Sequence, residues 1–181
     1  MSGLHTVRVT PATHASEVEN GEIVFIPTEI PNACPRNGTS MLKQIKCHLL
    51  DDHASDIELL FFSNSASMEA IGAAGAKFIF GGGNTTDTLV EQAGVLGDVM
   101  LDASVGVAGT AVSNQDGIHH EVKDYTGSLI HIVRNINLPV NPGNLTSTGT
   151  STPSSIYFAG IATATKTYTA AGLVFEFVFE F

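Results

Sequence analysis

The last nine residues have the most regular hydrophobic pattern in the chain. Every second position from Leu173 onward is apolar, and four of these positions are phenylalanine, while valine and glutamate alternate between them. Because successive side chains of a strand point to opposite faces, the segment predicts a strand with one wholly apolar face. Such a strand promotes association when it lies at an open edge. We therefore expect it to pair inside a sheet and to pack against a second sheet or another subunit.

Shorter alternating or apolar segments, bounded by glycine, proline and asparagine, predict further strands. They lie at residues 5–10, 22–26, 40–50, 56–63, 77–80, 95–102, 128–138 and 156–165. Turn-forming residues at 51–55 predict that the strands before and after them form a hairpin. A short turn near 166–171 predicts that 156–165 and 172–181 are antiparallel neighbours.

The remaining segments indicate loops and at most one short helix. Residues 27–39 hold three prolines and an Asn-Gly pair, 63–76 are rich in glycine and alanine, and 141–155 are almost all small or polar. These three ranges are predicted loops. Thr88 and Glu91 fit a capping box, which predicts a turn or two of helix near 87–93.

Together these elements predict one all-β domain spanning residues 1–181. Antiparallel strands joined by Gly/Pro-rich turns indicate a sandwich or barrel, and about eight strands with long loops favour a jelly-roll sandwich. Residues 1–19 are expected to form an N-terminal segment that acts as an arm. The side chains predicted to form the core are Ile45, Cys47, Leu49, Ile57, Leu59, Phe61, Ile130, Ile132, Phe175 and Phe177.

Composition narrows the function classes. Charged residues make up 14% of the chain, against about 25% in average soluble proteins. Eight basic and 18 acidic residues give a net charge of −10, without a Lys/Arg cluster. Nucleic-acid binding needs a positive surface, so we expect no nucleic-acid partner. No apolar run approaches the ~20 residues that cross a bilayer, so no membrane partner is expected.

The N-terminus lacks a basic region followed by an apolar one, and we expect synthesis and folding in a cytoplasm. Cys34 and Cys47 form no CxxC pair, so no bridge between them is required in a reducing compartment.

Two clusters contain potential ion ligands. Asp51, Asp52, His53 and Asp56 resemble an ion-binding loop, since Ca²⁺ prefers closely spaced carboxylates. The pattern lacks the turn glycine and closing glutamate of the calcium loop, which favours a solvated hairpin tip. The second cluster is His119, His120, Glu121 and Asp124. Adjacent histidines on a strand point apart and cannot share an ion without a special turn, so no metal site is predicted.

Catalytic motifs are scarce. No Gly-x-Ser-x-Gly element occurs, and the glycines at 81–83 are followed by no Walker lysine, which favours a simple turn. A Ser/His/Asp site assembled from distant positions stays open but has no activated nucleophile to support it. Sequons at Asn37, Asn84 and Asn144 are interpreted as coincidental. We predict a protein that is not an enzyme, without catalytic, cofactor-binding or metal-binding residues.

Several segments taken together resemble a diffuse group of tailed-bacteriophage virion proteins. One part of the resemblance runs from Leu42 to His53 and from Asp56 to Asn64. The other comprises Ile132 to Val140, Ser155 to Gly160, and Tyr168 to Phe177. In those proteins a polar loop separates the last two strands from a strand ending near Leu-Pro. The resemblance covers roughly residues 20–181 and is a pattern of strands and turns.

The resemblance implies a small β-rich structural subunit of the virion. It is similar to capsid decoration (cement) proteins, which sit on the head shell as oligomers, often trimers. The implied partners are the major capsid protein and further copies of this chain, and the implied location is the capsid surface. Contacts are expected through the three predicted loops and the N-terminal segment. The acidic net charge favours solubility at high copy number.

Two alternatives remain open. A structural protein of the tail, neck or head fibre would use the same β-fold. A carbohydrate-binding surface module would need solvent-facing aromatic rings, and the chain has no tryptophan and only Tyr125, Tyr157 and Tyr168.

Overall fold

The computed structural model describes residues 3–36, 38–50, 56–63, 74–76, 94–102, 112–114, 117–123, 129–142 and 154–181. For residues 102, 112–114, 117–123 and 129 only the backbone is described. The predicted strand at 77–80 and helix at 87–93 lie outside these residues, as does most of the predicted loops at 63–76 and 141–155.

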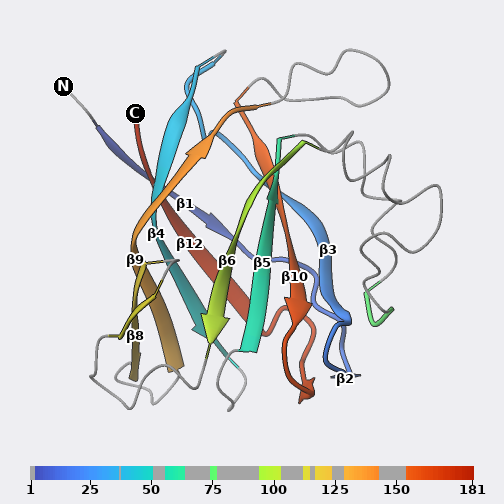
Figure 1. Cartoon of the computed structure of the whole chain (residues 1–181). Coiled ribbons are helices and arrows are strands. Elements are labelled where there is room, and N and C mark those ends of the chain that lie inside the picture. The colour runs from blue at the N-terminus through green and yellow to red at the C-terminus, as the bar shows by residue number, and fades with distance from the viewer. Residues whose placement is uncertain are drawn as a thin grey trace, which may run out of the picture.

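Two antiparallel sheets form the body of the protein (Figure 1). The six-stranded sheet has the order β1 (Leu4–Val9), β12 (Leu173–Glu180), β4 (Ser40–Leu49), β9 (Leu129–Val140), β8 (Gly117–Lys123) and β7 (Val112–Asn114). The four-stranded sheet has the order β3 (Ile23–Ile30), β10 (Ile156–Ala162), β5 (Asp56–Phe62) and β6 (Val95–Asp102). A small sheet joins β11 (Lys166–Thr167) to β2 (Glu17–Val18). The predicted all-β antiparallel class is confirmed.

Apart from β8, all strands of six or more residues pair in a nested order. β1 pairs with β12, β3 with β10, β4 with β9, and β5 with β6, so the first strand meets the last and each inner pair follows in turn. Each pair alternates between the two sheets. This is the strand order that arises when one long antiparallel pair of segments folds over on itself, as in a jelly roll.

The nested order makes both predicted hairpins wrong. β4 lies in the six-stranded sheet and β5 in the four-stranded sheet, so they do not pair. Likewise β10 and β12 belong to different sheets. In each case the two strands present apolar faces to each other across the core: the Phe158 ring on β10 lies 5.1 and 4.8 Å from the Phe175 and Phe177 rings on β12. An apolar face indicates burial, and it does not say whether the partner lies beside the strand or opposite it.

The prediction for the terminal strand is confirmed. β12 lies inside the six-stranded sheet, between β1 and β4. Its inward phenylalanines, 175, 177 and 179, are 0% exposed. Phe175 and Phe177 pack on Phe25, Phe61 and Phe158, which come from three strands of the other sheet, and Phe179 packs on Phe177.

Eight of the ten predicted core residues are fully buried, whereas Ile130 and Ile132 are only half-buried. The cause is a bulge in β9. Asn135 has φ 58°, and the pairing with β4 shifts register between Leu42 and Gln44. Before the bulge His131 and Val133 face the core, and after it Ile136 and Val140 do. A bulge reverses which side chains of a strand face the core. A single two-residue alternation over residues 128–138 therefore assigns the residues before the bulge to the wrong face.

Two prolines do not end their strands as predicted. β3 continues through Pro27 to Ile30, and β9 continues through Pro139 to Val140. β3 is an edge strand with a register shift against β10 at this point. At Pro139 β9 has passed the end of its pairing with β8, which stops at Arg134. Proline is tolerated where no neighbour needs its missing N–H.

The N-terminal residues 3–19 take part in the sandwich. Leu4–Val9 form β1, and Glu17–Val18 form β2. Backbone hydrogen bonds join His14 N–H to Val24 C=O at 2.8 Å and Tyr168 N–H to Ser16 C=O at 3.1 Å.

The phenylalanine cluster gives the first testable prediction. Phe177→Ala should lower the free energy of unfolding by about 3–5 kcal/mol, because it removes a fully buried ring. Phe181→Ala is the matched control: its ring is 42% exposed, and we expect a loss of about 1 kcal/mol or less. Urea denaturation of both variants measures the difference. Equal midpoints for the two would show that β12 does not hold the core.

Gly160 provides a second test. It lies on β10 at the register shift against β3, and a Cβ there would overlap the Phe25 ring. Gly160→Ala should therefore cost about 1–3 kcal/mol by overpacking. Gly3→Ala, where a Cβ meets nothing within 4 Å, should leave the thermal midpoint nearly unchanged. A Gly160→Ala protein as stable as wild type would contradict the close contact between β10 and the Phe25 ring.

Candidate binding surface on the outer face of the six-stranded sheet

Half of the eight ion-ligand candidates fall outside the described residues. Asp51, Asp52 and His53 lie outside the described residues, as does Asp124. Asp56 is described, and its Oδ2 lies 3.2 Å from Lys166 Nζ, so it holds β11 against β5. His119, His120 and Glu121 lie within strand β8, with the first two in register with Val133 and Ile132, and not in the special turn that a shared ion needs. The described residues contain no group of three or more His, Cys, Asp or Glu that could hold a metal.

The other sequence candidates add no site. Gly81–Gly83 and the sequons at Asn37, Asn84 and Asn144 fall outside the described residues. Tyr157 and Tyr168 are 5% and 1% exposed, so neither offers a ring to solvent, and Tyr125 is not described. A Ser–His contact joins Ser16 Oγ and His14 Nε2 at 2.6 Å. It joins residues two positions apart on one segment, whereas catalytic triads draw on different elements.

A line of ion pairs crosses the outer face of the six-stranded sheet, the face turned away from the four-stranded sheet. Glu176 on β12 lies in register between Arg8 on β1 and Lys46 on β4. Its carboxylate is 3.4 Å from Lys46 Nζ and 3.4 Å from His48 Nε2. His48 Nε2 forms no hydrogen bond with this carboxylate. All three side chains are only partly exposed, so the ion pairs contribute to the shape of this outer face.

A second group of polar contacts lies at the bulges. Lys43 is an extra residue in β4 relative to β12, because Val178 pairs with Gln44 and Phe179 with Leu42. Lys43 Nζ is 3.2 Å from Glu180 Oε2 and donates a hydrogen bond to Asn137 Oδ1 at 2.8 Å. Lys43 thus links β4 to both β12 and β9, at the positions where the pairing of β4 with each of them shifts register. The sequence gives no signal for this link beyond the polar residues at 43–48.

Apolar side chains lie among these charges. Met41, Ile130, Ile132 and Val178 are half-buried, and they alternate with the inward residues of their strands. Arg8 and Arg134 are exposed beside them. An antiparallel sheet with a solvated face usually presents polar side chains there. Apolar positions flanked by arginine are instead typical of protein–protein interfaces.

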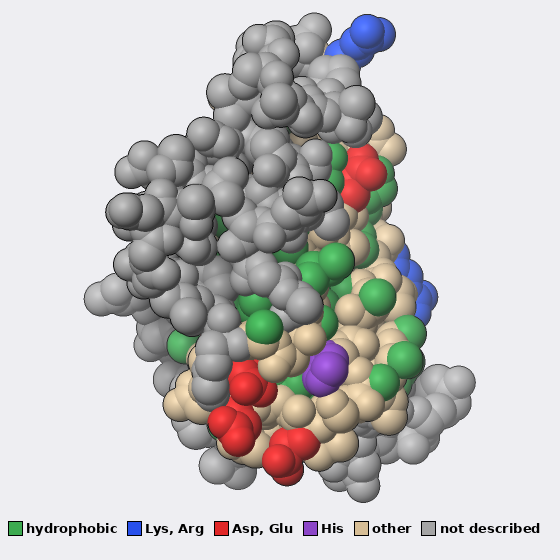
Figure 2. All heavy atoms as spheres, turned by 90° about the vertical axis from the view of Figure 1, so that its right-hand side faces the viewer, with side chains coloured by type: hydrophobic (Ala, Val, Ile, Leu, Met, Phe, Trp, Pro, Cys, Tyr) green, Lys and Arg blue, Asp and Glu red, His purple; other side chains and the backbone are tan. Residues whose placement is uncertain are grey.

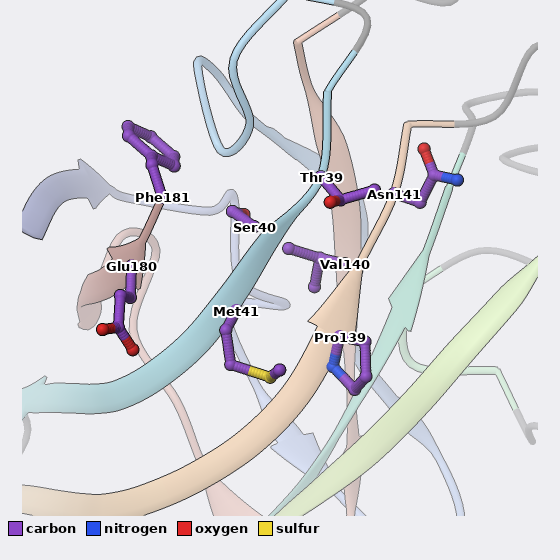
Figure 3. A pocket seen from close by; sticks show the side chains of 8 residues that line it. All are labelled: Thr39, Ser40, Met41, Pro139, Val140, Asn141, Glu180 and Phe181. Carbon is purple, nitrogen blue, oxygen red and sulfur yellow. The ribbon is translucent and has the colours of Figure 1, made fainter. Parts of the chain in front are cut away.

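A shallow pocket of about 640 Å³ continues this surface to the end of the sheet. Its eight lining residues are Thr39, Ser40, Met41, Pro139, Val140, Asn141, Glu180 and Phe181. Figure 3 shows Phe181 and Glu180 on one side, Pro139 and Asn141 on the other, and the start of β4 between them. The Phe181 ring stacks on His5 at 5.5 Å, and the nearby Leu4 is 73% exposed. The pocket suits an apolar side chain better than a reacting group.

No family model, curated protein or solved structure matches the chain. Within the part of the chain that the structure describes, no helix is long and apolar enough to cross a membrane.

The two cysteines are buried, Cys47 on the inner face of β4 and Cys34 beside two residues that line the pocket. Cys34 Sγ is 3.4 Å from Ser40 Oγ and 3.5 Å from Val140 O. Burial raises the pKa of the Cys34 thiol above its ordinary value of 9.0, and burial raises the pKa of Cys47 further. Both side chains therefore stay neutral thiols at pH 8.

Thiol reactivity tests this arrangement. Only the thiolate is nucleophilic, so native protein at pH 8 should react with a disulfide reagent at least about tenfold more slowly than free cysteine. Both thiols should react at once in denaturant. Because the folded pKa values are raised, the thiols' contribution to stability is complete below pH 9.0 and declines as pH rises above it. Rapid labelling of native protein would place a thiol at the surface.

Proposed function

We propose that this protein is a non-enzymatic structural subunit of a virion, an oligomeric capsid decoration protein that stabilises the head shell through contacts with the major capsid protein. The observation that carries the proposal is the correspondence between the resemblance and the fold. The segments that resemble phage virion proteins contribute to β4, β5, β9, β10 and β12. These strands form the centre of both sheets, so the resemblance covers one continuous core.

The surface supports the same reading. The outer face of the six-stranded sheet combines apolar side chains, internally paired charges and two exposed arginines, and it adjoins a shallow pocket. Such a surface fits a protein partner by shape and charge. The net charge of −10 keeps many copies soluble before they assemble.

Homo-oligomerisation belongs to the proposal. Symmetric assemblies repeat one interface, and a decoration protein must match the local symmetry of the shell. We propose a trimer, for which light scattering of the purified chain should give a mass near three times 19.0 kDa.

Copy number in purified virions tests the proposed location. Mass spectrometry should identify the chain in intact particles, and a stained gel should give hundreds of copies relative to the major capsid protein. About a dozen copies or fewer would favour the tail, neck or head-fibre alternative. Removing the gene should yield capsids that form but fail sooner on heating. Absence of the chain from the particles, or capsids of unchanged heat stability without it, would contradict the decoration role.

A further inference from the structure

The basic residues of the chain are concentrated on four strands of the six-stranded sheet. β1, β4, β9 and β12 carry four basic residues, Arg8, Lys43, Lys46 and Arg134, against Glu176 and Glu180. These are half of the eight basic residues in the chain, and the face has a net charge of +2 with histidine neutral. Since the chain has a net charge of −10, the rest of it carries −12.

Of the 16 acidic residues outside these four strands (18 less Glu176 and Glu180), three lie together at and just after β2. From residue 9 to residue 35 the chain contains four glutamates and no lysine or arginine. Glu17 and Glu19 are exposed and Glu22 is half-exposed, around the buried anchor Val18. We call these three glutamates the β2 end. In Figure 2 acidic side chains gather at the lower end of the molecule, and the visible lysine and arginine atoms lie at the margins. The adjacent Lys166 is already paired with Asp56.

The two regions lie on different sides of the molecule. In Figure 1 β2 lies at the lower right, while β1, β4, β9 and β12 lie on the left. One copy can therefore use its basic face and its acidic end at the same time, with two different neighbours.

We propose that the outer face of the six-stranded sheet binds the β2 end of a second copy of this chain. This inference deepens the proposed function, which already includes a homo-oligomer, by assigning the two surfaces that meet. Arg8 and Arg134 have no ion pair with any residue that the structure describes, and they lie on β1 and β9, three strand spacings or about 14 Å apart. Glu176, Lys46 and Val178 lie on the strands between them, and Ile132 lies beside Arg134 on β9. Carboxylates of a partner can therefore meet the arginines at the rim while Val178 is covered between them.

Charge decides the type of contact. Stacking this face on its own copy across a two-fold axis would oppose two surfaces of charge +2, and like-charge contact is unfavourable. Binding of the face to the acidic end is attractive and heterologous. A heterologous contact closes into a ring when the rotation allows it, which suits a cyclic trimer.

Charge-swap variants of the full chain test the inference. The face variant is Arg8→Glu with Arg134→Glu, and the end variant is Glu17→Lys with Glu19→Lys. Each should associate at least about tenfold more weakly than wild type in sedimentation and light scattering. Mixing the two variants should restore association, because the acidic end of one then meets the unchanged basic face of the other, and the two reversed surfaces also match. Circular dichroism and thermal midpoints confirm that each variant is folded.

The controls are exposed charges away from both surfaces. Arg36→Glu and Glu29→Lys reverse single exposed charges and should leave the mass at the wild-type value. Wild-type association should also weaken as salt rises, since rim charges are screened over about 8 Å at physiological ionic strength.

Three outcomes would overturn the inference: a face variant that keeps the wild-type mass, a mixture that fails to restore association, or a wild-type protein of 19.0 kDa at every concentration. The first two outcomes leave the proposed oligomer and its location in virions untouched. A wild-type monomer would also contradict the proposed trimer, whereas the copy number in virions tests the decoration role independently.

Discussion

The packing of one strand against the opposite sheet is the contact on which the rest of the fold depends. Phe175 and Phe177 of β12 meet Phe25, Phe61 and Phe158, whose strands lie side by side in the four-stranded sheet, with ring centroids 4.8–6.0 Å apart in the cross-sheet contacts. Phe179 packs on Phe177. β12 also pairs with β1 on one side and β4 on the other. It therefore fixes both the distance between the sheets and the order of strands within one of them, and the nested pairing follows from closing the first strand onto the last.

That contact explains which parts of the fold can be predicted from sequence. Alternation identifies β5, β12 and the Ile45–Leu49 part of β4 because each has an uninterrupted apolar face, and burial is a property of the strand's own residues. The strand with which each of them pairs cannot be predicted in this way. The connections from β4 to β5 and from β10 to β12 cross between sheets, and short polar turns look the same whether they lead to a neighbour or to the opposite layer. The long-range pairings of β4 with β9, of β10 with β3 and of β12 with β1, which the local pattern does not encode, decide between the two.

Bulges are the second limit. In β9 the alternation reverses at Asn135, so Ile130 and Ile132 face outward while His131 is 1% exposed. In β4 the extra residue Lys43 does the same, and its contacts with Glu180 and Asn137 hold the two irregular strands together. Bulges concentrate where a side chain is re-aimed or pairing ends. Neither bulge carries a glycine or proline at the reversal. Asn135 is a weak local cue, because asparagine adopts positive φ more readily than most residues, and Lys43 gives none, so the outer-face residues could not be found from the sequence alone.

The cost of this arrangement indicates where function lies. A strand that turned Ile130 and Ile132 inward would bury two large apolar groups and leave a histidine in solvent, and the observed register does the reverse. Sequences usually agree with their fold at every level, and local disagreement is expected at functional surfaces. Half-buried isoleucines on an outer face are unfavourable while they contact water, and a partner that covers them removes this cost. The charges of the arginines beside them can orient the partner. An aromatic core and a discordant outer face on the described part of the six-stranded sheet fit the proposed assembly, because a partner that covers Ile130 and Ile132 removes their contact with water.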